Sequence, residues 1–248
     1  DAAGNVSGVI GFSVDITDFI RAGEKNRLAV RITDPSGNFD WGDYHLDRWG
    51  RHYIPPSHGF GGITGRVILY ALDRISIHKV FIMNKPDITS VDIRLEIRNL
   101  TGKPASGTLT TGIFRTGSSR CLTREKRTLE ISDSVAQLLI PLQLEGAEPW
   151  SPDNPNLYRL EIEWKGRDGS TDQWKGPFGF RWFEVRSDSG DRQFYLNGER
   201  IFLLSSISWG FWPGNGIFPQ HGMERKQVET ARQLGLNMLN FHRAIGDP

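Results

Sequence analysis

Hydrophobic and polar residues alternate along most of the first 186 residues, which is typical of strands with one buried face. Clusters rich in glycine, proline and asparagine separate these segments and predict turns. The segments predicted as strands are Arg27–Ile32, Gly65–Tyr70, Ile75–Ile82, Val91–Ile97, Gly107–Phe114, Arg127–Ile131, Ala136–Leu142, Leu157–Trp164 and Phe178–Val185. The pattern predicts a mainly β chain.

The periodicity changes in the last part of the chain. Ile201–Leu204 is a continuous apolar run, as in a strand covered on both faces, and Met223–Leu234 places apolar residues on one helical face. Gly235 suits the position just after a helix, and Leu236–His242 predicts another strand. This order predicts one β-α-β unit. Such a unit buries both faces of its strands only when further elements follow, so we expect a chain cut from a larger domain.

The stretch Phe178–Arg200 divides the chain, because an alternating run there ends in the polar turn Ser187–Asp191. We therefore expect three domains. Residues 1–85 form a first β-rich part, residues 86–186 form a second, and residues 187–248 contain the β-α-β unit. The middle part has about 100 residues, which is the size of an immunoglobulin-like sandwich.

Charge and cysteine content narrow the classes of partner. The 30 basic and 29 acidic residues leave a formal net charge of +1, so we expect neither nucleic acid nor a membrane surface as a partner. No apolar run approaches the roughly 20 residues of a membrane span. Cys121 is the single cysteine and indicates no redox compartment. A periplasmic or secreted location and a cytoplasmic one both stay open.

Several kinds of catalytic or ligand site find no support in the sequence. Ser205 and Ser206 lack the Gly-x-Ser-x-Gly setting of a nucleophile, and no glycine-rich turn between a strand and a helix is present to hold phosphate. The loop from Asp34 to Gly62 is rich in histidine and aspartate, but its irregular spacing specifies no metal site. We expect no cofactor and no metal.

Several motifs occur in an order that resembles glycoside hydrolase family 2, which includes β-galactosidases, β-glucuronidases and β-mannosidases. The motifs are DIT at Asp15–Thr17, GEKNRLAV at Gly23–Val30, GGITGRV at Gly61–Val67, EPWSPDNPNLYRLEI at Glu148–Ile162, FGFRWFEV at Phe178–Val185, FYLNGERIFL at Phe194–Leu203 and ARQLGLNMLNFHRA at Ala231–Ala244. By this resemblance, residues 1–85 are the later part of a jelly-roll sugar-binding domain. Residues 86–186 are an immunoglobulin-like domain, and residues 187–248 begin a (β/α)8 barrel.

The resemblance implies retaining hydrolysis of β-glycosidic bonds by two carboxyl groups. Family members carry both glutamates at the ends of later barrel strands, so we expect no catalytic residue in this chain. Glu199, Glu224 and Glu229 fall in a turn and on the predicted helix, whereas barrel chemistry collects at the carboxyl ends of strands. The implied partner is a carbohydrate substrate. Family members also often associate through their β-domains, which implies a homo-oligomer.

The residues expected to contact that substrate come from three places in the chain. One group lies at the end of the second strand of the β-α-β unit, one on the loop after its first strand, and one on a jelly-roll loop that leans over the site. They are Asn240, His242 and Arg243, then Trp209 and Trp212, then Asp43 and His45. Tryptophan faces suit the apolar faces of sugar rings. Each group has a structural alternative. Asn240 could satisfy a buried backbone group and His242 close the barrel end, the tryptophans could pack against the sandwich, and the loop with Asp43 and His45 could be a solvated surface loop or an interdomain contact.

A second hypothesis belongs to another class of function. The chain would then be a non-catalytic carbohydrate-binding or scaffolding module, in which the β-domains act without hydrolysis. The enzyme hypothesis is favoured because the start of the barrel follows the sandwich without a flexible linker. Hydrolysis of glycosides by the longer protein distinguishes the two.

Overall fold

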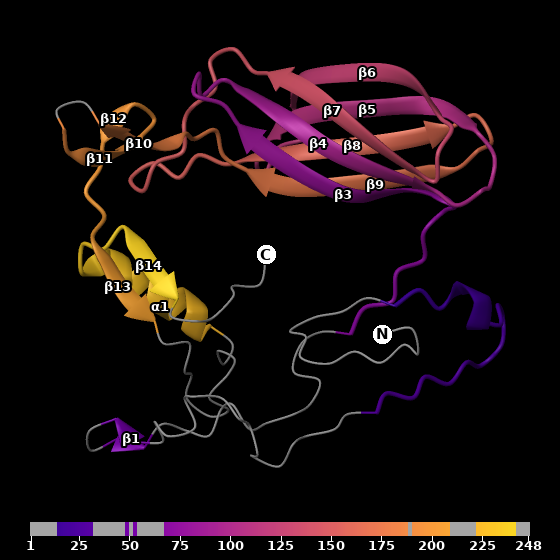
Figure 1. Ribbon diagram of the computed structural model, residues 1–248, viewed down its shortest axis with the longest axis horizontal. Coiled ribbons are helices and arrows are strands. Elements are labelled where there is room, and N and C mark those ends of the chain that lie inside the picture. The colour runs from indigo at the N-terminus through magenta and orange to yellow at the C-terminus, as the bar shows by residue number, and fades with distance from the viewer. Residues whose placement is uncertain are drawn as a thin grey trace. The chain divides into compact units, whose positions relative to one another are not determined.

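Figure 1 shows the chain as a computed structural model, which describes residues 14–31, 48–49, 52–53, 67–187, 190–208 and 222–241. The chain divides into two compact units, Asp1–Thr64 and Gly65–Pro248. In the first unit the described elements are a 3-10 helix, Thr17–Phe19, and the antiparallel pair β1 (Arg48–Trp49) and β2 (His52–Tyr53). The described residues are mainly β, as expected, with one α-helix.

Seven strands of the second unit form a sandwich of two antiparallel sheets (Figure 1). One sheet has the order β3-β4-β7, and the other has the order β6-β5-β8-β9. The strands are β3 (Ile75–Asn84), β4 (Ser90–Asn99), β5 (Ala105–Arg115), β6 (Cys121–Ile131), β7 (Val135–Gln143), β8 (Tyr158–Gly166) and β9 (Thr171–Phe178). Every hydrogen-bonded pair of neighbours in these sheets is antiparallel.

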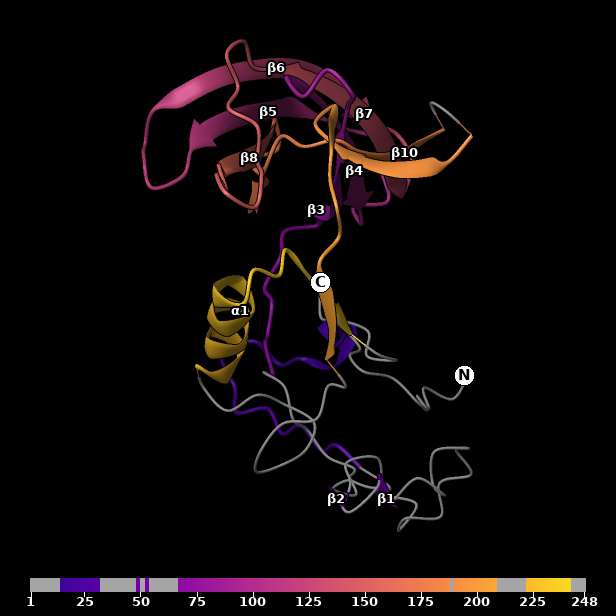
Figure 2. The ribbon, with the colours of Figure 1, turned by 90° about the vertical axis from the view of Figure 1, so that its left-hand side faces the viewer.

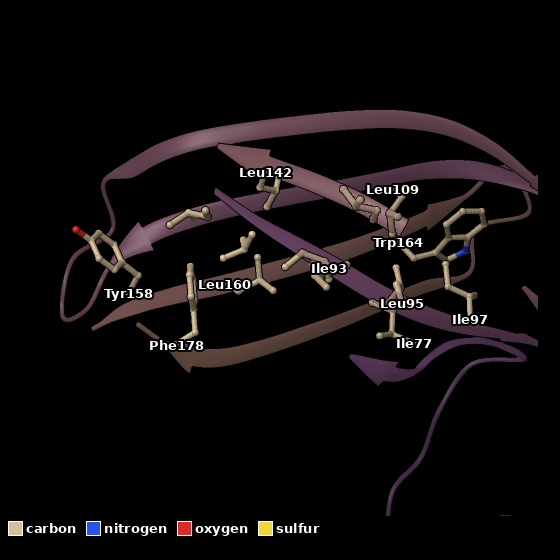
Figure 3. Packing of buried hydrophobic residues seen from close by; sticks show 14 of the residues in the cluster. Ile77, Ile93, Leu95, Ile97, Leu109, Leu142, Tyr158, Leu160, Trp164 and Phe178 are labelled. Carbon is tan, nitrogen blue, oxygen red and sulfur yellow. The ribbon is translucent and has the colours of Figure 1, made fainter. Parts of the chain in front are cut away.

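The core lies between the two sheets and follows the alternation seen in the sequence (Figure 3). In β4 every second residue from Val91 to Ile97 is apolar and 0% exposed, while the residues between them are partly buried or exposed. Trp164 of β8 is also 0% exposed and packs from the opposite sheet. Burial of each aliphatic side chain of this kind contributes about 1.5–3 kcal/mol. The apolar side chains therefore determine which face of each strand points into the core.

The strand β3 belongs to this sandwich, which differs from the expected boundary at residues 85 and 86. β3 pairs with β4 along its whole length, and Ile75 is 0% exposed in the shared core. Between them the chain makes a tight turn in which Ile88 N–H donates to Lys85 O at 3.1 Å. Pro86 therefore lies in a hairpin turn and does not mark the start of the sandwich.

Two of the predicted strands are absent from the described residues. Residues 27–31 and 67–70, which are the described parts of the predicted strands Arg27–Ile32 and Gly65–Tyr70, contain no strand. Leu28 is 70% exposed and Val67 is 71% exposed. Alternation provides an apolar face, but a strand forms only when a partner pairs with it. In these two places the expectation was wrong.

The end of the sandwich also differs from the prediction of one strand over Phe178–Val185. The strand β9 stops at Phe178, and β10 (Phe183–Ser187) starts a separate sheet with β11 (Arg192–Leu196) and β12 (Glu199–Arg200). Between β9 and β10 the backbone forms a hydrogen bond with the Trp150 loop, in which Phe180 O accepts from Trp150 N–H at 2.8 Å. The linking segment is therefore fixed by the Trp150 loop and not by a β-ladder.

The last described elements form the expected β-α-β unit (Figure 2). The strands β13 (Ser205–Ser208) and β14 (Met238–Phe241) pair in parallel, and α1 (Met223–Gln233) connects them in sequence. Gly235 ends the helix with φ of 78°, as predicted, and Leu236 N–H closes it by donating to Ala231 O at 2.9 Å. The first strand lies after the apolar run Ile201–Leu204, which itself forms no strand.

Candidate functional site

The candidate site is the carboxyl edge of the parallel pair β13 and β14, where both strands end. Asn240 pairs in register with Ile207. The Asn240 side chain is exposed, and Ile207 is 52% exposed. In parallel sheets the carboxyl ends of strands are where ligand-binding groups collect. Asn240 therefore offers an amide donor and acceptor at the expected edge.

Asn237 sets the register that brings Asn240 to this edge. Its side-chain amide donates to Phe202 O at 2.8 Å, and its Oδ1 accepts from Leu204 N–H at 2.9 Å. Its own backbone N–H donates to Leu204 O at 3.0 Å. These three bonds tie the start of β14 to the residues just before β13. A single asparagine thus determines which residues face one another at the far ends of both strands.

Asn240 is the one predicted site residue that the structure describes. The others, which are His242, Arg243, Trp209, Trp212, Asp43 and His45, lie outside the described residues. Along the chain, Trp209 directly follows β13 and His242 directly follows β14. The expectation that these residues meet around a substrate stays a prediction.

The glutamates near this unit lie away from the carboxyl edge. Glu224, in the first turn of α1, accepts a bond of 3.4 Å from Gly222 N–H. Glu229 lies 3.8 Å from Arg225 on the helix surface, where both side chains are exposed. Glu199 belongs to the short strand β12. Among the described residues, this edge therefore presents an amide for binding and no pair of carboxyl groups for acid and base chemistry.

Neither a metal centre nor a membrane span emerges from the described ranges. They contain no group of three or more histidine, cysteine, aspartate or glutamate residues that could hold a metal ion. Within the same ranges no helix is long and apolar enough to cross a membrane.

A concave surface lies on the sandwich, where β3 and β9 run side by side. This surface, which we call the edge groove, has a volume of about 440 Å³. Its described lining includes Phe81, Trp150, Trp174 and Arg181. Sequence analysis did not single out these residues as a site. They come from distant segments and meet only through the pairing of the sheets, so no local motif indicated them.

Residues 75–181 match the family model described as glycosyl hydrolases family 2. The matched range begins at the first residue of β3 and ends three residues after β9, so it coincides with the sandwich. This agreement supports the start of the sandwich at Ile75.

Proteins similar to the chain over most of its length carry glycosidase names. A β-glucuronidase of Formosa agariphila is 25% identical over 85% of this chain and 22% of its own length. A β-glucuronidase of Bacteroides fragilis is 25% identical over 93% of this chain and 32% of its own length. A β-galactosidase of Clostridium acetobutylicum is 28% identical over 76% of this chain and 19% of its own length. The chain thus spans less than a third of these relatives.

Solved structures show the same fold. The crystal structure of a Bacteroides uniformis β-glucuronidase superposes with a TM-score of 0.61 at 22% identity, covering 71% of this chain and 22% of that one. The sandwich at residues 75–181 thus matches the model of glycosyl hydrolases family 2, and the chain that carries it is similar to β-glucuronidases and β-galactosidases.

Proposed function

We propose that this chain is part of a retaining glycoside hydrolase that cleaves β-glycosidic bonds in the breakdown of carbohydrates. The observation that carries the proposal is the order of parts along the chain. A sandwich that matches the family 2 model is followed by a parallel β-α-β unit with no long linker between them. The names of the similar proteins, β-glucuronidase and β-galactosidase, point to the same reaction class.

The proposed reaction needs two carboxyl groups about 5–5.5 Å apart, one to protonate the leaving oxygen and one to attack the anomeric carbon. We assign both to a part of the whole protein that follows residue 248. The positions of Glu199, Glu224 and Glu229, which are away from the carboxyl edge of β13 and β14, support this assignment. The 248-residue chain alone is then inactive.

In this proposal the chain contributes one wall of the substrate site. Asn240 at the end of β14 would meet a sugar hydroxyl, because its exposed amide both donates and accepts hydrogen bonds. The neighbours proposed to act with it are His242, Arg243, Trp209, Trp212, Asp43 and His45. The β-α-β unit would be the start of a (β/α)8 barrel, and the preceding residues a jelly-roll domain. The seven strands in two sheets support an immunoglobulin-like domain between them.

Hydrolysis of a panel of nitrophenyl glycosides tests the proposal. The longer protein that contains this chain is assayed beside the 248-residue chain, with β-glucuronide, β-galactoside and β-mannoside substrates and their α-anomers as controls. We expect the longer protein to cleave a β-glycoside and the chain to cleave none. Turnover by the chain alone would overturn the placement of the carboxyl groups. An inactive longer protein would instead favour a non-catalytic carbohydrate-binding or scaffolding module.

The role of Asn240 has its own test in the longer protein. Removing a hydrogen bond to the substrate costs about 0.5–1.5 kcal/mol, so Asn240→Ala should lower kcat/KM by about two- to tenfold. Val228→Ala is the matched control, since Val228 is 59% exposed on α1 and lies away from the strand ends. An unchanged kcat/KM for the Asn240 variant would remove this residue from the proposed wall.

A further inference from the structure

The edge groove is an opening between the edge strands of the two sheets. The strands β3 and β9 are tied together at both ends of their shared run. At one end Asp172 Oδ2 accepts from Ile77 N–H at 2.7 Å, and at the other Asn84 Oδ1 accepts from Arg181 N–H at 3.3 Å. Between these ties the sheets stay apart and leave the volume of about 440 Å³. The two hydrogen bonds therefore mark the ends of the groove, and Arg181 lies three residues after the end of β9.

Two tryptophans lie against the backbone along the groove, and glycines make room for both. A Cβ atom at Gly176 would come within 2.2 Å of the Trp174 ring, and one at Gly179 would come within 2.8 Å of Trp150 Cβ. Only a glycine lets each indole lie so close to the chain. Phe81 borders the groove from β3, but it pairs with the exposed Arg94, so its side chain lies on the outer face of that sheet. Both tryptophans are partly exposed. The groove thus presents aromatic surface to a ligand.

The bordering strands are built against pairing with a further strand. β9 carries Pro177, which has no backbone N–H to donate, and Lys175. β3 carries a register shift between Ile77 and Lys79. Proline, lysine and bulges are devices that keep an edge from accepting another strand. An extended peptide that adds to either sheet is therefore a poor occupant for this groove.

The charge of the groove selects among other ligands. Arg181 is the one ionisable residue in the described lining. Its guanidinium lies 5.0 Å from the centre of the Trp150 ring, and within the described part of the chain no carboxylate forms an ion pair with it. A guanidinium stacked on a ring keeps its donors in its own plane, where they can bind a carboxylate with two parallel bonds. The groove therefore favours an anion that also has an apolar face.

We propose that the edge groove binds a glycan containing uronic acid, with a sugar ring against Trp174 and its carboxylate on Arg181. Pyranose rings have apolar faces that pack on aromatic side chains, and the Asn84 amide suits a hydroxyl. The site lies on the sandwich and is separate from the strand ends of β13 and β14. The choice of a sugar over another organic acid rests on the proposed glycosidase function.

The test is a titration of the 248-residue chain followed by NMR of its tryptophan indole N–H groups. The two probes are cellotetraose and the same β-1,4-linked tetrasaccharide oxidised to carboxylates at every C6. We expect the indole signals of Trp150 and Trp174 to move with the acidic probe, while that of Trp164, which is 0% exposed, stays fixed. The acidic probe should bind about tenfold more tightly than the neutral one, because its carboxylate can form charge-assisted hydrogen bonds with the Arg181 guanidinium.

Matched variants locate the binding. Arg181→Gln should remove the preference for the acidic probe, and Arg181→Lys should keep only part of it because the planar fork is lost. Trp174→Ala should weaken both probes alike. Arg124 is exposed on β6, at the opposite edge of the four-stranded sheet from β9. Arg124→Gln removes the same charge there and should change the affinity for neither probe.

Three results would overturn the proposal. They are the absence of saturable shifts at Trp150 and Trp174, equal affinity for both probes, and a preference that survives Arg181→Gln. This readout does not depend on hydrolysis. If the longer protein cleaves glycosides while the chain binds neither probe, the groove proposal falls and the proposed function stands. If the chain binds the acidic probe while the longer protein is inactive, the proposed function falls and the groove proposal stands.

Discussion

Asn197 has a left-handed backbone, with φ of 54°, in the turn between β11 and β12. Its Oδ1 accepts from Trp182 N–H at 2.9 Å, and its side-chain amide donates to Trp150 O at 2.9 Å. Its backbone N–H also donates to Trp182 O at 2.8 Å. One residue therefore joins the small β10-β11-β12 sheet to the sandwich loop that holds Trp150.

Two substitutions of Asn197 should separate what its backbone conformation and its side-chain hydrogen bonds each contribute to the free energy of unfolding. Asn197→Gly keeps the left-handed turn but loses two side-chain hydrogen bonds, which should lower the free energy of unfolding by about 1–3 kcal/mol. Asn197→Ala loses the same bonds and also strains the backbone, so we expect a further loss of about 1–3 kcal/mol. Urea unfolding of the 248-residue chain measures both. Equal stability of the two variants would show that the left-handed conformation is not strained for alanine.

The turn before β4 should lower the pKa of the Asp87 carboxyl group. Ser90 Oγ donates to Asp87 Oδ2 at 2.5 Å, and Thr89 N–H donates to Asp87 Oδ1 at 3.0 Å. The serine bond first, and then the backbone bond from Thr89, hold the pKa of Asp87 below its ordinary value of 3.8. Because the folded pKa is lower than the unfolded one, these bonds stabilise the fold above the unfolded pKa. That contribution is lost as the pH falls through the folded pKa.

Ser90→Ala should therefore raise the pKa of Asp87 toward its ordinary value, as NMR titration of the carboxyl carbon can measure. Asp168 is the internal control, since its pKa is lowered chiefly by a hydrogen bond from Ser170 and should not move. A pKa of Asp87 that is the same in both proteins would mean that the serine bond does not form in solution.

At the scale of single elements, β5 shows how closely neighbouring strands of one sheet are packed. A Cβ atom at Gly107 would lie 2.4 Å from the Trp164 ring and 2.6 Å from Lys165 O. The carbonyl belongs to the paired strand β8, so it cannot move without breaking the ladder. At Gly112 of the same strand, the nearest atom would be the edge of the Phe114 ring at 3.2 Å. The two glycines therefore differ in what surrounds them, while their strand is the same.

Gly107→Ala should cost about 1–3 kcal/mol of unfolding free energy, because the added methyl overlaps a buried indole and a backbone oxygen. Gly112→Ala is the matched control and should change stability by less than about 1 kcal/mol, since a small ring movement makes room. Thermal and urea unfolding of both variants measures the difference. A Gly107 variant as stable as the Gly112 variant would contradict the tight packing of Trp164.

Strands with a clean alternation were predictable because burial on one face determines them. Val91–Ile97 and Ala136–Leu142 lie within β4 and β7 as expected. The strand β9 was missed because Gly176 and Pro177 are rare inside strands, yet a sheet edge tolerates them. The first strand of the β-α-β unit was predicted at Ile201–Leu204, but it lies at Ser205–Ser208 as β13. These residues are mostly polar, and the position of the strand depends on hydrogen bonds with Asn237.

The candidate site was predictable only where it depends on a local pattern. The β-α-β order and Gly235 were enough to place Asn240 at the end of a strand, which the structure confirms. The edge groove could not be foreseen, because Trp150 and Arg181 come together through hydrogen bonds between distant backbone segments. Sequence patterns specify which face of an element is buried, whereas this surface depends on how the edges of two sheets meet.

At the scale of the whole molecule, one continuous core defines one domain. Every fully or nearly buried member of the core cluster falls between Ile75 and Phe180. The range that matches the glycosyl hydrolase family 2 model, residues 75–181, has nearly the same limits. The start of the domain therefore lies at β3, and a division at residue 86 would pass through the hairpin that joins β3 to β4.

Two fragments test this boundary directly. Residues 73–187 retain the whole core together with Asp73, whose Oδ2 accepts from Thr171 N–H at 2.8 Å, and should fold cooperatively. Residues 86–186 lose β3, and with it Ile75 and Ile77, which are 0% and 9% exposed. Their burial contributes about 1.5–3 kcal/mol each, a large share of the roughly 5–15 kcal/mol that stabilises a domain. The shorter fragment should therefore be unfolded or several kcal/mol less stable by circular dichroism and urea unfolding. Equal midpoints for the two fragments would show that β3 is dispensable and would return the boundary to residue 86.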